Sequence, residues 1–271
     1  MNRRILTLAI PSIVANITTP LLSLVDTAIV GHLGSAVYIG AIAVGGVMFN
    51  MLYWLFSFLR GGTSGLTAQA FGAGDSADTS AVLWRSLAVG TLIGTAMVLL
   101  QWPLELILRH FVDPDPVTAS LAGRYFRILI YGAPAVLATY ALNGWFLGMQ
   151  NSRMLMITSL VVNITNIAAS LLLVFGLHMR IEGVALGTLL AQWTGAVIFL
   201  AAVLRKYRPQ TVARRRLLDP GALRRLFSIN TDIFLRTLCL VAVTVWFTRA
   251  GAMQSVSVLA ANALLMQLFM F

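Results

Sequence analysis

Apolar blocks about as long as a bilayer is thick recur along this chain of 271 residues. A helix needs roughly 20 apolar residues to cross the hydrocarbon core of a membrane. Hydrophobic residues make up 59% of the sequence and charged residues only 10%, whereas soluble proteins have about 25% charged residues. The sequence therefore predicts an all-α integral membrane protein, with spans at residues 5–30, 37–59, 82–102, 125–147, 155–176, 184–204 and 231–250. An eighth block begins near residue 256 and is still apolar at Phe271, so we expect about seven and a half spans of a longer protein.

The first apolar block contains one carboxylate, Asp26. A charge at the centre of a membrane helix is unfavourable by roughly 2.5–3.5 kcal/mol on insertion scales, and such residues commonly belong to ion or proton pathways. The other carboxylates lie at the ends of the predicted spans or between them. Two interpretations follow: Asp26 is an intramembrane functional residue, or it lies near the outer end of its helix and reaches the headgroups.

The basic residues are distributed unevenly between the two sides of the predicted membrane. One side has 13 of the 19, of which eight lie between residues 205 and 225 and the others are Arg3, Arg4, Arg60, Arg85 and Arg153. The opposite side has Arg109, Arg124, Arg127, Arg180 and Arg249, and the remaining Arg236 lies at the start of the seventh predicted span. This bias predicts a cytoplasmic amino terminus. The basic segment is expected to anchor the topology and to contact membrane lipids, and no nucleic-acid partner is expected.

A weak internal similarity suggests how the chain is organised. Residues 34–48 (GSAVYIGAIAVGGVM) align with residues 251–265 (GAMQSVSVLAANALL) at an offset of 217, although two Ala-rich spans can also align by chance. Repeats of this kind build many transporters. We therefore expect a six-helix amino-terminal lobe at residues 1–204, a basic cytoplasmic linker at 205–228 and the start of a second lobe at 229–271.

Polar side chains and prolines interrupt several of the predicted spans. Pro11 removes a backbone donor and kinks the first span, which also contains Asn16. In the fifth span Asn163, Asn166 and Ser170 are spaced i, i+3, i+7 and therefore share one helix face. Thr188 and Gln192 lie on the sixth span. Polar stripes of this kind more often make interhelical hydrogen bonds than bind ions, but Asp26 would need such partners.

Four sequence blocks carry a family resemblance. The first span, from Pro11 to residues 25–34 (VDTAIVGHLG), resembles the first helix of the multidrug and toxic compound extrusion (MATE) transporters. Residues 65–75 (GLTAQAFGAGD) resemble the signature that follows the family's second helix, and residues 148–153 (GMQNSR) resemble its turn between helices four and five. Residues 230–236 (NTDIFLR) are similar to the DNA-damage-inducible (DinF) branch.

The resemblance implies an antiporter of twelve helices in two six-helix lobes around a central cavity. Such proteins export organic, often cationic or amphipathic compounds in exchange for protons or sodium. It assigns cation coupling to Asp26, with Asn166, Ser170 and Thr188 as helper positions, and bending of the first helix to Pro11. Many members have a second aspartate where this chain has Ser170, which favours protons over sodium here. We expect a monomer in the bacterial inner membrane that handles small organic substrates and contacts membrane lipids.

Alternatives of other classes are open at this stage. A lipid or lipid-linked oligosaccharide flippase would share the architecture but is expected to line its cavity with basic residues. An enzyme is not expected, because Asp26 has no second intramembrane acid in the first six spans. Candidates for the substrate cavity are Asn16, Tyr131, Tyr140, Asn163 and Gln192.

Two further sets of charged or titratable residues have simple interpretations. Asp232 and Arg236 are spaced i, i+4 at the start of the seventh span, which favours a helix-end ion pair over a gating role. His32, His110 and His178 match no metal-site spacing, so neither a metal nor a cofactor is expected and a proton or sodium gradient would drive transport.

The charge bias generates a prediction about topology. Cysteines introduced between residues 205 and 225 should react with a membrane-impermeant maleimide only after the membrane is permeabilised, because the positive-inside bias places this segment in the cytoplasm. Labelling of intact cells would show that the orientation is reversed.

Overall fold

The computed structural model describes residues 13, 25, 28–32, 36–112, 116–210, 212, 217, 219–226, 228, 231–236 and 238–239. Regular structure within these residues is helical. The sequence candidates Pro11, Asn16 and Asp26 lie outside the described residues.

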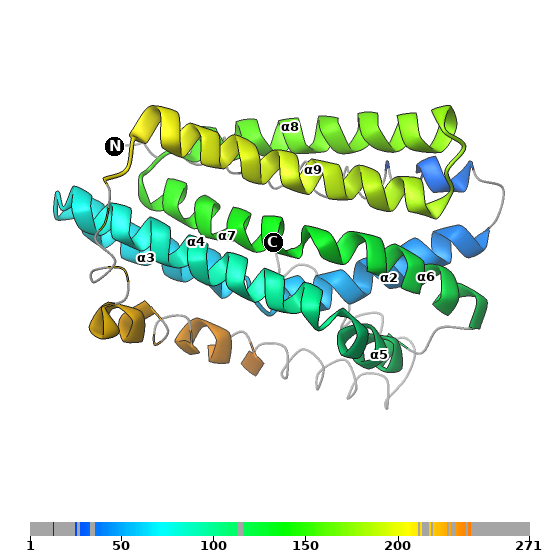
Figure 1. Ribbon diagram of the computed structural model, residues 1–271, viewed down its shortest axis with the longest axis horizontal. Coiled ribbons are helices and arrows are strands. Elements are labelled where there is room, and N and C mark those ends of the chain that lie inside the picture. The colour runs from blue at the N-terminus through cyan, green and yellow to red at the C-terminus, as the bar shows by residue number, and fades with distance from the viewer. Residues whose placement is uncertain are drawn as a thin grey trace, which may run out of the picture.

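The described elements form long helical stretches, and consecutive membrane-length stretches run in opposite directions (Figure 1). They are α2 (Ala36–Trp54), α3 (Phe58–Gly72), α4 (Ser76–Leu99), α5 (Gln101–Val112), α6 (Pro116–Leu129), the 3-10 turn η1 (Ile130–Gly132), α7 (Ala133–Gly148), α8 (Ser152–Leu171), the π turn η2 (Leu172–Gly176), α9 (Ile181–Ala202) and the π turn η3 (Val203–Tyr207). Five continuous helical stretches are long and apolar enough to cross a membrane: Val37–Gly72, Ser76–Leu99, Pro116–Gly148, Ser152–Gly176 and Ile181–Tyr207. The predicted second to sixth spans are therefore confirmed.

The turns between these helices explain two of the sequence blocks that carry the family resemblance, residues 65–75 and residues 148–153, taken here in that order. In the first block, Gly74 adopts a positive φ of 73°, which glycine tolerates. Asp75 then caps α4, since its Oδ1 accepts a 2.7 Å hydrogen bond from the Asp78 backbone N–H. In the second block, Asn151 caps α8 by accepting a hydrogen bond from the Met154 N–H. Both blocks thus begin helices at one end of the bundle, called here the α3–α4 end.

Close backbone contact surrounds α7, which packs against α3, α4 and α9. A Cβ atom at Gly90 of α4 would lie 2.8 Å from the Leu137 carbonyl oxygen, and one at Gly94 would lie 2.6 Å from the Pro134 nitrogen. On the α3 side, a Cβ atom at Gly148 would lie 2.7 Å from the Ser64 carbonyl oxygen. Small residues at these positions let the backbones approach, as is usual between membrane helices.

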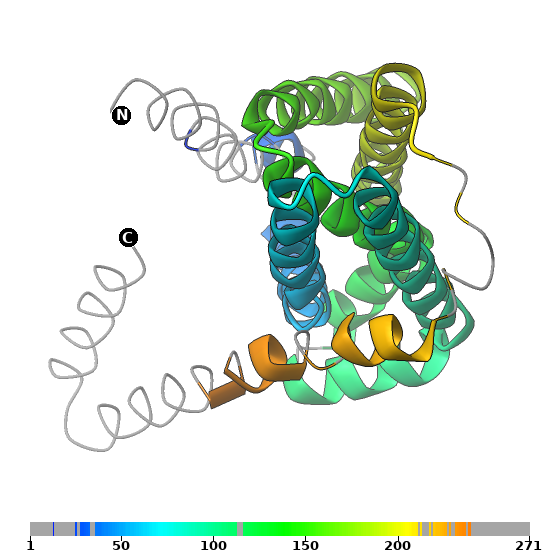
Figure 2. The ribbon, with the colours of Figure 1, turned by 90° about the vertical axis from the view of Figure 1, so that its left-hand side faces the viewer.

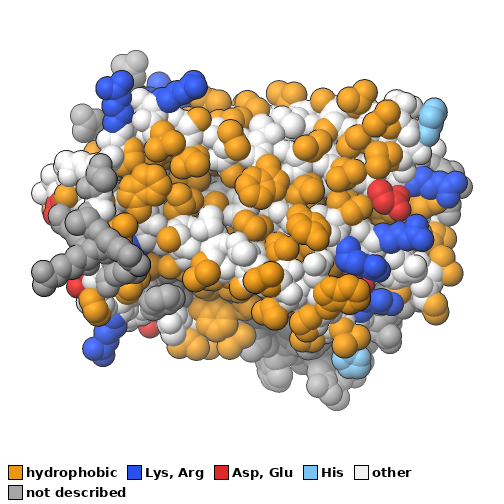
Figure 3. Space-filling model, viewed as in Figure 1, with side chains coloured by type: hydrophobic (Ala, Val, Ile, Leu, Met, Phe, Trp, Pro, Cys, Tyr) orange, Lys and Arg blue, Asp and Glu red, His pale blue; other side chains and the backbone are white. Residues whose placement is uncertain are grey.

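The outer surface of the bundle has the pattern of a membrane protein. Hydrophobic side chains form a belt between charged side chains at the two ends of the long axis (Figure 3). The belt includes Leu92 on α4, Ile164 on α8 and Val197 on α9, which are all at least 60% exposed. Exposure of this extent is unfavourable in water and favourable against lipid.

The structure places several basic residues that the sequence had assigned only to one side of the membrane. Arg60 and Arg85 lie inside α3 and α4. Arg85 is buried, and its guanidinium lies 3.8 Å from the Asp78 carboxylate. The connection after the third span also contains a helix of its own, α5, in which Glu105 pairs with Arg109 at 3.6 Å and with Arg127 of α6 at 3.2 Å.

The described parts of the proposed linker lie against the bundle. Helical residues 220–226 lie across the ends of α3 and α4 (Figure 2). Leu226 is 2% exposed and packs with Leu66 and Val82. The division into lobes at residues 204 and 229 stays a prediction.

The contacts of α7 generate a prediction about stability. Gly94→Ala should lower the free energy of unfolding by about 1–3 kcal/mol, because the new methyl group would overlap the Pro134 backbone. Gly46→Ala is the matched control, since no described heavy atom lies within 4 Å of the new Cβ. Thermal unfolding of the two detergent-purified variants checks this, and equal midpoints would contradict it.

Candidate functional site

A pair of hydrogen bonds joins α8 and α9 inside the apolar belt. Asn166 of α8 is fully buried, and its Nδ2 donates to Oγ1 of Thr188 on α9 at 2.9 Å. The Thr188 hydroxyl in turn donates to the Val184 carbonyl oxygen at 3.0 Å. Because the Thr188 proton is used in this way, its oxygen needs a donor, and this requirement orients the Asn166 amide.

The same interface contains polar atoms that no described residue satisfies. Oδ1 of Asn166 and Oγ of Ser170 are buried without a hydrogen-bond partner among the described residues. A buried polar atom of this kind typically destabilises a fold by about 1–3 kcal/mol. The Asn166 oxygen can only accept a hydrogen bond, whereas the Ser170 hydroxyl can donate or accept. The two atoms could therefore serve a carboxyl group or a cation brought to this place.

Glycines on α9 make this close packing feasible. A Cβ atom at Gly187 would lie 2.8 Å from the Ser170 backbone nitrogen, and one at Gly183 would lie 3.1 Å from Val174 Cγ2. Gly183 and Gly187 form a GxxxG pattern, which commonly marks a helix–helix contact in membranes. Our sequence reasoning missed these two residues, although this pattern could have indicated them.

The described residues around position 26 belong to the same neighbourhood. Ile29 and Val30 form a buried cluster with Val174 and Val184, and Val25 packs against it. Val184 is the residue whose carbonyl oxygen accepts the Thr188 hydrogen bond. The end of the first predicted span thus contacts α9 one turn from Thr188.

The sequence candidates for the substrate cavity lie in different places. Tyr140 lines a cavity of about 380 Å³ together with Asn50, Met51, Tyr53 and Trp54 of α2. Sequence reasoning missed Asn50, a polar residue within an apolar block whose position could have indicated it.

The other described candidates are not among the residues that line this cavity. Tyr131 is 51% exposed, and its carbonyl oxygen accepts a 3.2 Å hydrogen bond from Trp193 Nε1. Gln192 contacts the position where Gly132 would carry a Cβ atom. Nδ2 of Asn163 and Oε1 of Gln192 are buried without a described hydrogen-bond partner.

Charged candidates near the end of the chain are exposed. Asp232 and Arg236 lie on helical residues 231–236, and the ion pairs among the described residues do not include one between them. The pair stays a prediction. The described residues contain no group of three His, Cys, Asp or Glu side chains that could hold a metal ion.

Comparison with known proteins identifies the class. The family model MatE matches residues 11–172, and the bundle resembles solved transporters. A MOP superfamily transporter from Pyrococcus furiosus superposes with a TM-score of 0.81 at 22% identity, over 98% of this chain and 60% of that one. The chain belongs to the MATE family of membrane transporters.

Curated relatives place the chain more closely within the family. It is 39% identical over 270 residues to DNA damage-inducible protein F of Escherichia coli, covering 97% of this chain and 58% of the relative. It is also 26% identical over 248 residues to multidrug resistance protein MdtK of Cronobacter sakazakii, covering 86% of this chain and 52% of that protein. The chain thus spans between half and two thirds of the length of these relatives.

The α8–α9 hydrogen bonds generate a prediction. Thr188→Val should lower the free energy of unfolding by about 0.6–1.7 kcal/mol, the range for hydrogen bonds between membrane helices, because Asn166 Nδ2 loses its acceptor. Thr194→Val on the same helix is the control, since its hydroxyl bonds only the Leu190 carbonyl oxygen one turn earlier. Thermal unfolding should also show that Thr188→Ser retains the parent stability. A similar loss in both valine variants would contradict the assignment.

Proposed function

We propose that this protein is a secondary active antiporter that exports organic, cationic or amphipathic compounds in exchange for protons rather than sodium. Membership of the MATE family and the similarity to a protein named for multidrug resistance support the export of such compounds. The observation that carries the proposal is a pair of buried oxygens between α8 and α9, those of Asn166 and Ser170, for which the described part of the chain offers no hydrogen-bond partner.

These two oxygens suit both protonation states of a carboxyl group. A protonated carboxylic acid can donate a hydrogen bond to Asn166 Oδ1, which only accepts. An ionised carboxylate can accept one from the Ser170 hydroxyl. The pair therefore offers partners to a group that gains and loses a proton, while Thr188 holds the Asn166 amide in place.

Asp26 is the carboxyl group that we assign to this site. Val25 and Ile29 lie on either side of it in the sequence; Ile29 belongs to the cluster that contains Val174 and Val184, and Val25 packs against that cluster. Asp26 is also the carboxylate that the family resemblance marks for coupling. Because Ser170 supplies a hydroxyl and not a second carboxylate, the site has little negative charge with which to hold sodium, a hard cation that binds oxygen ligands.

Export requires that the proton and the substrate favour different states of the protein. Protonation makes Asp26 neutral and removes the cost of an intramembrane charge. We assign to Pro11 the bending of the first span that accompanies this change. The alternation itself needs a ligand with different affinities for the two states, and the organic substrate supplies that difference.

The flippase alternative finds less support. A flippase is expected to line the central transport cavity with basic side chains, and the basic residues of α6 are engaged in ion pairs. Arg124 lies 3.5 Å from Glu182, and Arg127 lies 3.2 Å from Glu105. We further propose a monomer in the bacterial inner membrane with a cytoplasmic amino terminus.

Asp26→Asn tests the proposed function. The variant should fold and insert, because the amide retains the shape of the side chain and removes a buried charge. Efflux driven by an imposed proton gradient should fall to background in membrane vesicles with matched expression. Glu182→Gln is the control and should keep efflux, since the partner described for its side chain is the exposed Arg124. Undiminished proton-driven efflux by Asp26→Asn would show that coupling lies elsewhere.

A further inference from the structure

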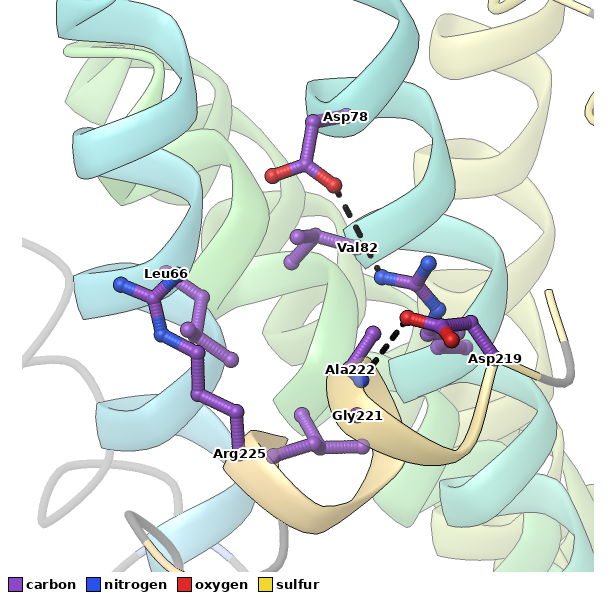
Figure 4. A pocket seen from close by; sticks show the side chains of 9 residues that line it. Leu66, Asp78, Val82, Asp219, Gly221, Ala222 and Arg225 are labelled. Atoms are coloured by element: carbon purple, nitrogen blue, oxygen red, sulfur yellow. Dashed lines mark hydrogen bonds and ion pairs between the residues drawn. The ribbon is translucent and has the colours of Figure 1, made fainter. Parts of the chain in front are cut away.

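A polar cavity of about 250 Å³ lies at the α3–α4 end, between α4 and residues 219–226 (Figure 4). Asp78 and Arg85 line it from α4, and Asp219 and Arg225 line it from residues 219–226. We call it the Arg85 cavity. Its volume far exceeds the roughly 30 Å³ that one water occupies, so it has room for a group of several heavy atoms.

The walls of the Arg85 cavity are held in place by specific contacts. The Arg85 side chain is 6% exposed, and its Nε donates to the Leu217 carbonyl oxygen at 3.2 Å. Arg225 donates to the Gln69 side chain of α3. Asp219 Oδ2 accepts a 3.0 Å hydrogen bond from the Ala222 N–H at the start of helical residues 220–226. These contacts position two guanidinium groups and two carboxylates around one space.

The charges around the Arg85 cavity balance. Asp78 and Arg225 come from different elements and lie on opposite sides of it (Figure 4). Asp78 also contacts Arg85 at 3.8 Å. Two positive and two negative groups complement a ligand that carries both charges, whereas a purely anionic ligand would face two carboxylates.

An apolar cavity lies further along the same face of α4. It has a volume of about 290 Å³ and is lined by Leu55, Phe56, Phe58, Val89, Ile93, Thr231 and Phe234. Val82, Val89 and Ile93 are spaced i, i+7, i+11 and therefore follow one helix face. Val82 lines the polar cavity, and Val89 packs against the cluster that contains Val82. A rise of 1.5 Å per residue places Val89 about 10 Å deeper than Val82 along the helix.

We propose that the two cavities together hold one phospholipid whose headgroup carries a phosphate and a primary ammonium, as in phosphatidylethanolamine. The phosphate lies between Arg85 and Arg225, because guanidinium groups match phosphate geometry. The ammonium donates hydrogen bonds to Asp78 and Asp219. One acyl chain follows the apolar cavity towards the middle of the membrane.

The lining residues favour a primary over a quaternary ammonium. Quaternary ammonium groups have no N–H to donate and are typically recognised by aromatic cages. The residues that line the Arg85 cavity include two carboxylates and no aromatic side chain. This lipid site begins at the α3–α4 end and does not depend on the proposed antiport. Bound there, the lipid links residues 219–226 to the bundle.

Lipid titrations of the delipidated, detergent-purified protein test the ligand class. Thermal unfolding followed by circular dichroism should show a rise in midpoint with dioleoyl-phosphatidylethanolamine that exceeds the rise with the matching phosphatidylcholine or phosphatidylglycerol. Free phosphoethanolamine should act in the same direction at higher concentration, since it lacks the chains. An equal or larger response to phosphatidylglycerol or phosphatidylcholine would overturn the proposal.

Paired variants test the two cavities separately. Arg225→Gln should weaken the phosphatidylethanolamine response roughly tenfold or more in concentration, as expected for a lost charge-assisted hydrogen bond. Arg224→Gln, an exposed neighbour that does not line the cavity, should stay within about twofold of the parent by the same arithmetic. An unchanged response in Arg225→Gln, or an equal loss in both variants, would overturn the headgroup assignment.

A second pair of variants tests the apolar cavity. Ile93→Trp should fill it and reduce the response to the lipid but not to free phosphoethanolamine. Leu92→Trp is the control, because Leu92 is 71% exposed and does not line the cavity. Should Ile93→Trp fail to fold, Val89→Phe fills the same space with a smaller side chain. A parent-like lipid response in the folded variant would overturn the acyl-chain assignment.

Discussion

Close backbone contact around α7 is the constraint on which the arrangement of the other helices depends. Lipid supplies no hydrophobic driving force between helices, so their association relies on packing and on interhelical hydrogen bonds. Gly90 and Gly94 bring α4 against the start of α7, and Gly148 brings its end against α3. The core beside this contact is dense, with Phe126, Ile130 and Leu137 fully buried. This closely packed centre contacts both the α8–α9 pair and helices α3 and α4.

The polar interface of α8 and α9 combines close packing with buried polar atoms that lack a described hydrogen-bond partner. Gly187 allows the two backbones to meet at Ser170, and the hydrogen bond from Asn166 to Thr188 then fixes the amide. Two buried oxygens are left without described partners. Unsatisfied polar atoms are costly in a membrane protein, where water is absent from the hydrocarbon region. Their presence beside the cluster of Ile29 and Val30 is most simply explained by a ligand or side chain that uses them.

The charged residues divide into three kinds of environment. At the end where α5 begins, Arg109, Arg124 and Arg127 are engaged with Glu105 and Glu182. At the α3–α4 end, Arg153 and Lys206 are exposed, and Lys206 belongs to the basic segment. Arg85 is different, because it is buried within a membrane-length helix and holds a segment that is more than 130 positions away in the sequence. A buried guanidinium needs such partners to offset its desolvation.

The number, approximate bounds and membrane character of the second to sixth spans could be predicted from the sequence, because length and hydropathy are local properties of a chain. The shared face of Asn163, Asn166 and Ser170 likewise follows from helical spacing, and the motif blocks at residues 65–75 and 148–153 already resembled the family that the chain proved to belong to. Only the tertiary structure decided that Thr188 is the partner of Asn166, that Gly187 lies against Ser170, and that the buried Arg85 donates to the Leu217 carbonyl oxygen. It also revealed α5, in which the buried carboxylate of Glu105 pairs with Arg109 of the same helix and with Arg127 of α6. These features depend on which helix faces which neighbour, and that choice is made by the packing of the whole bundle around α7.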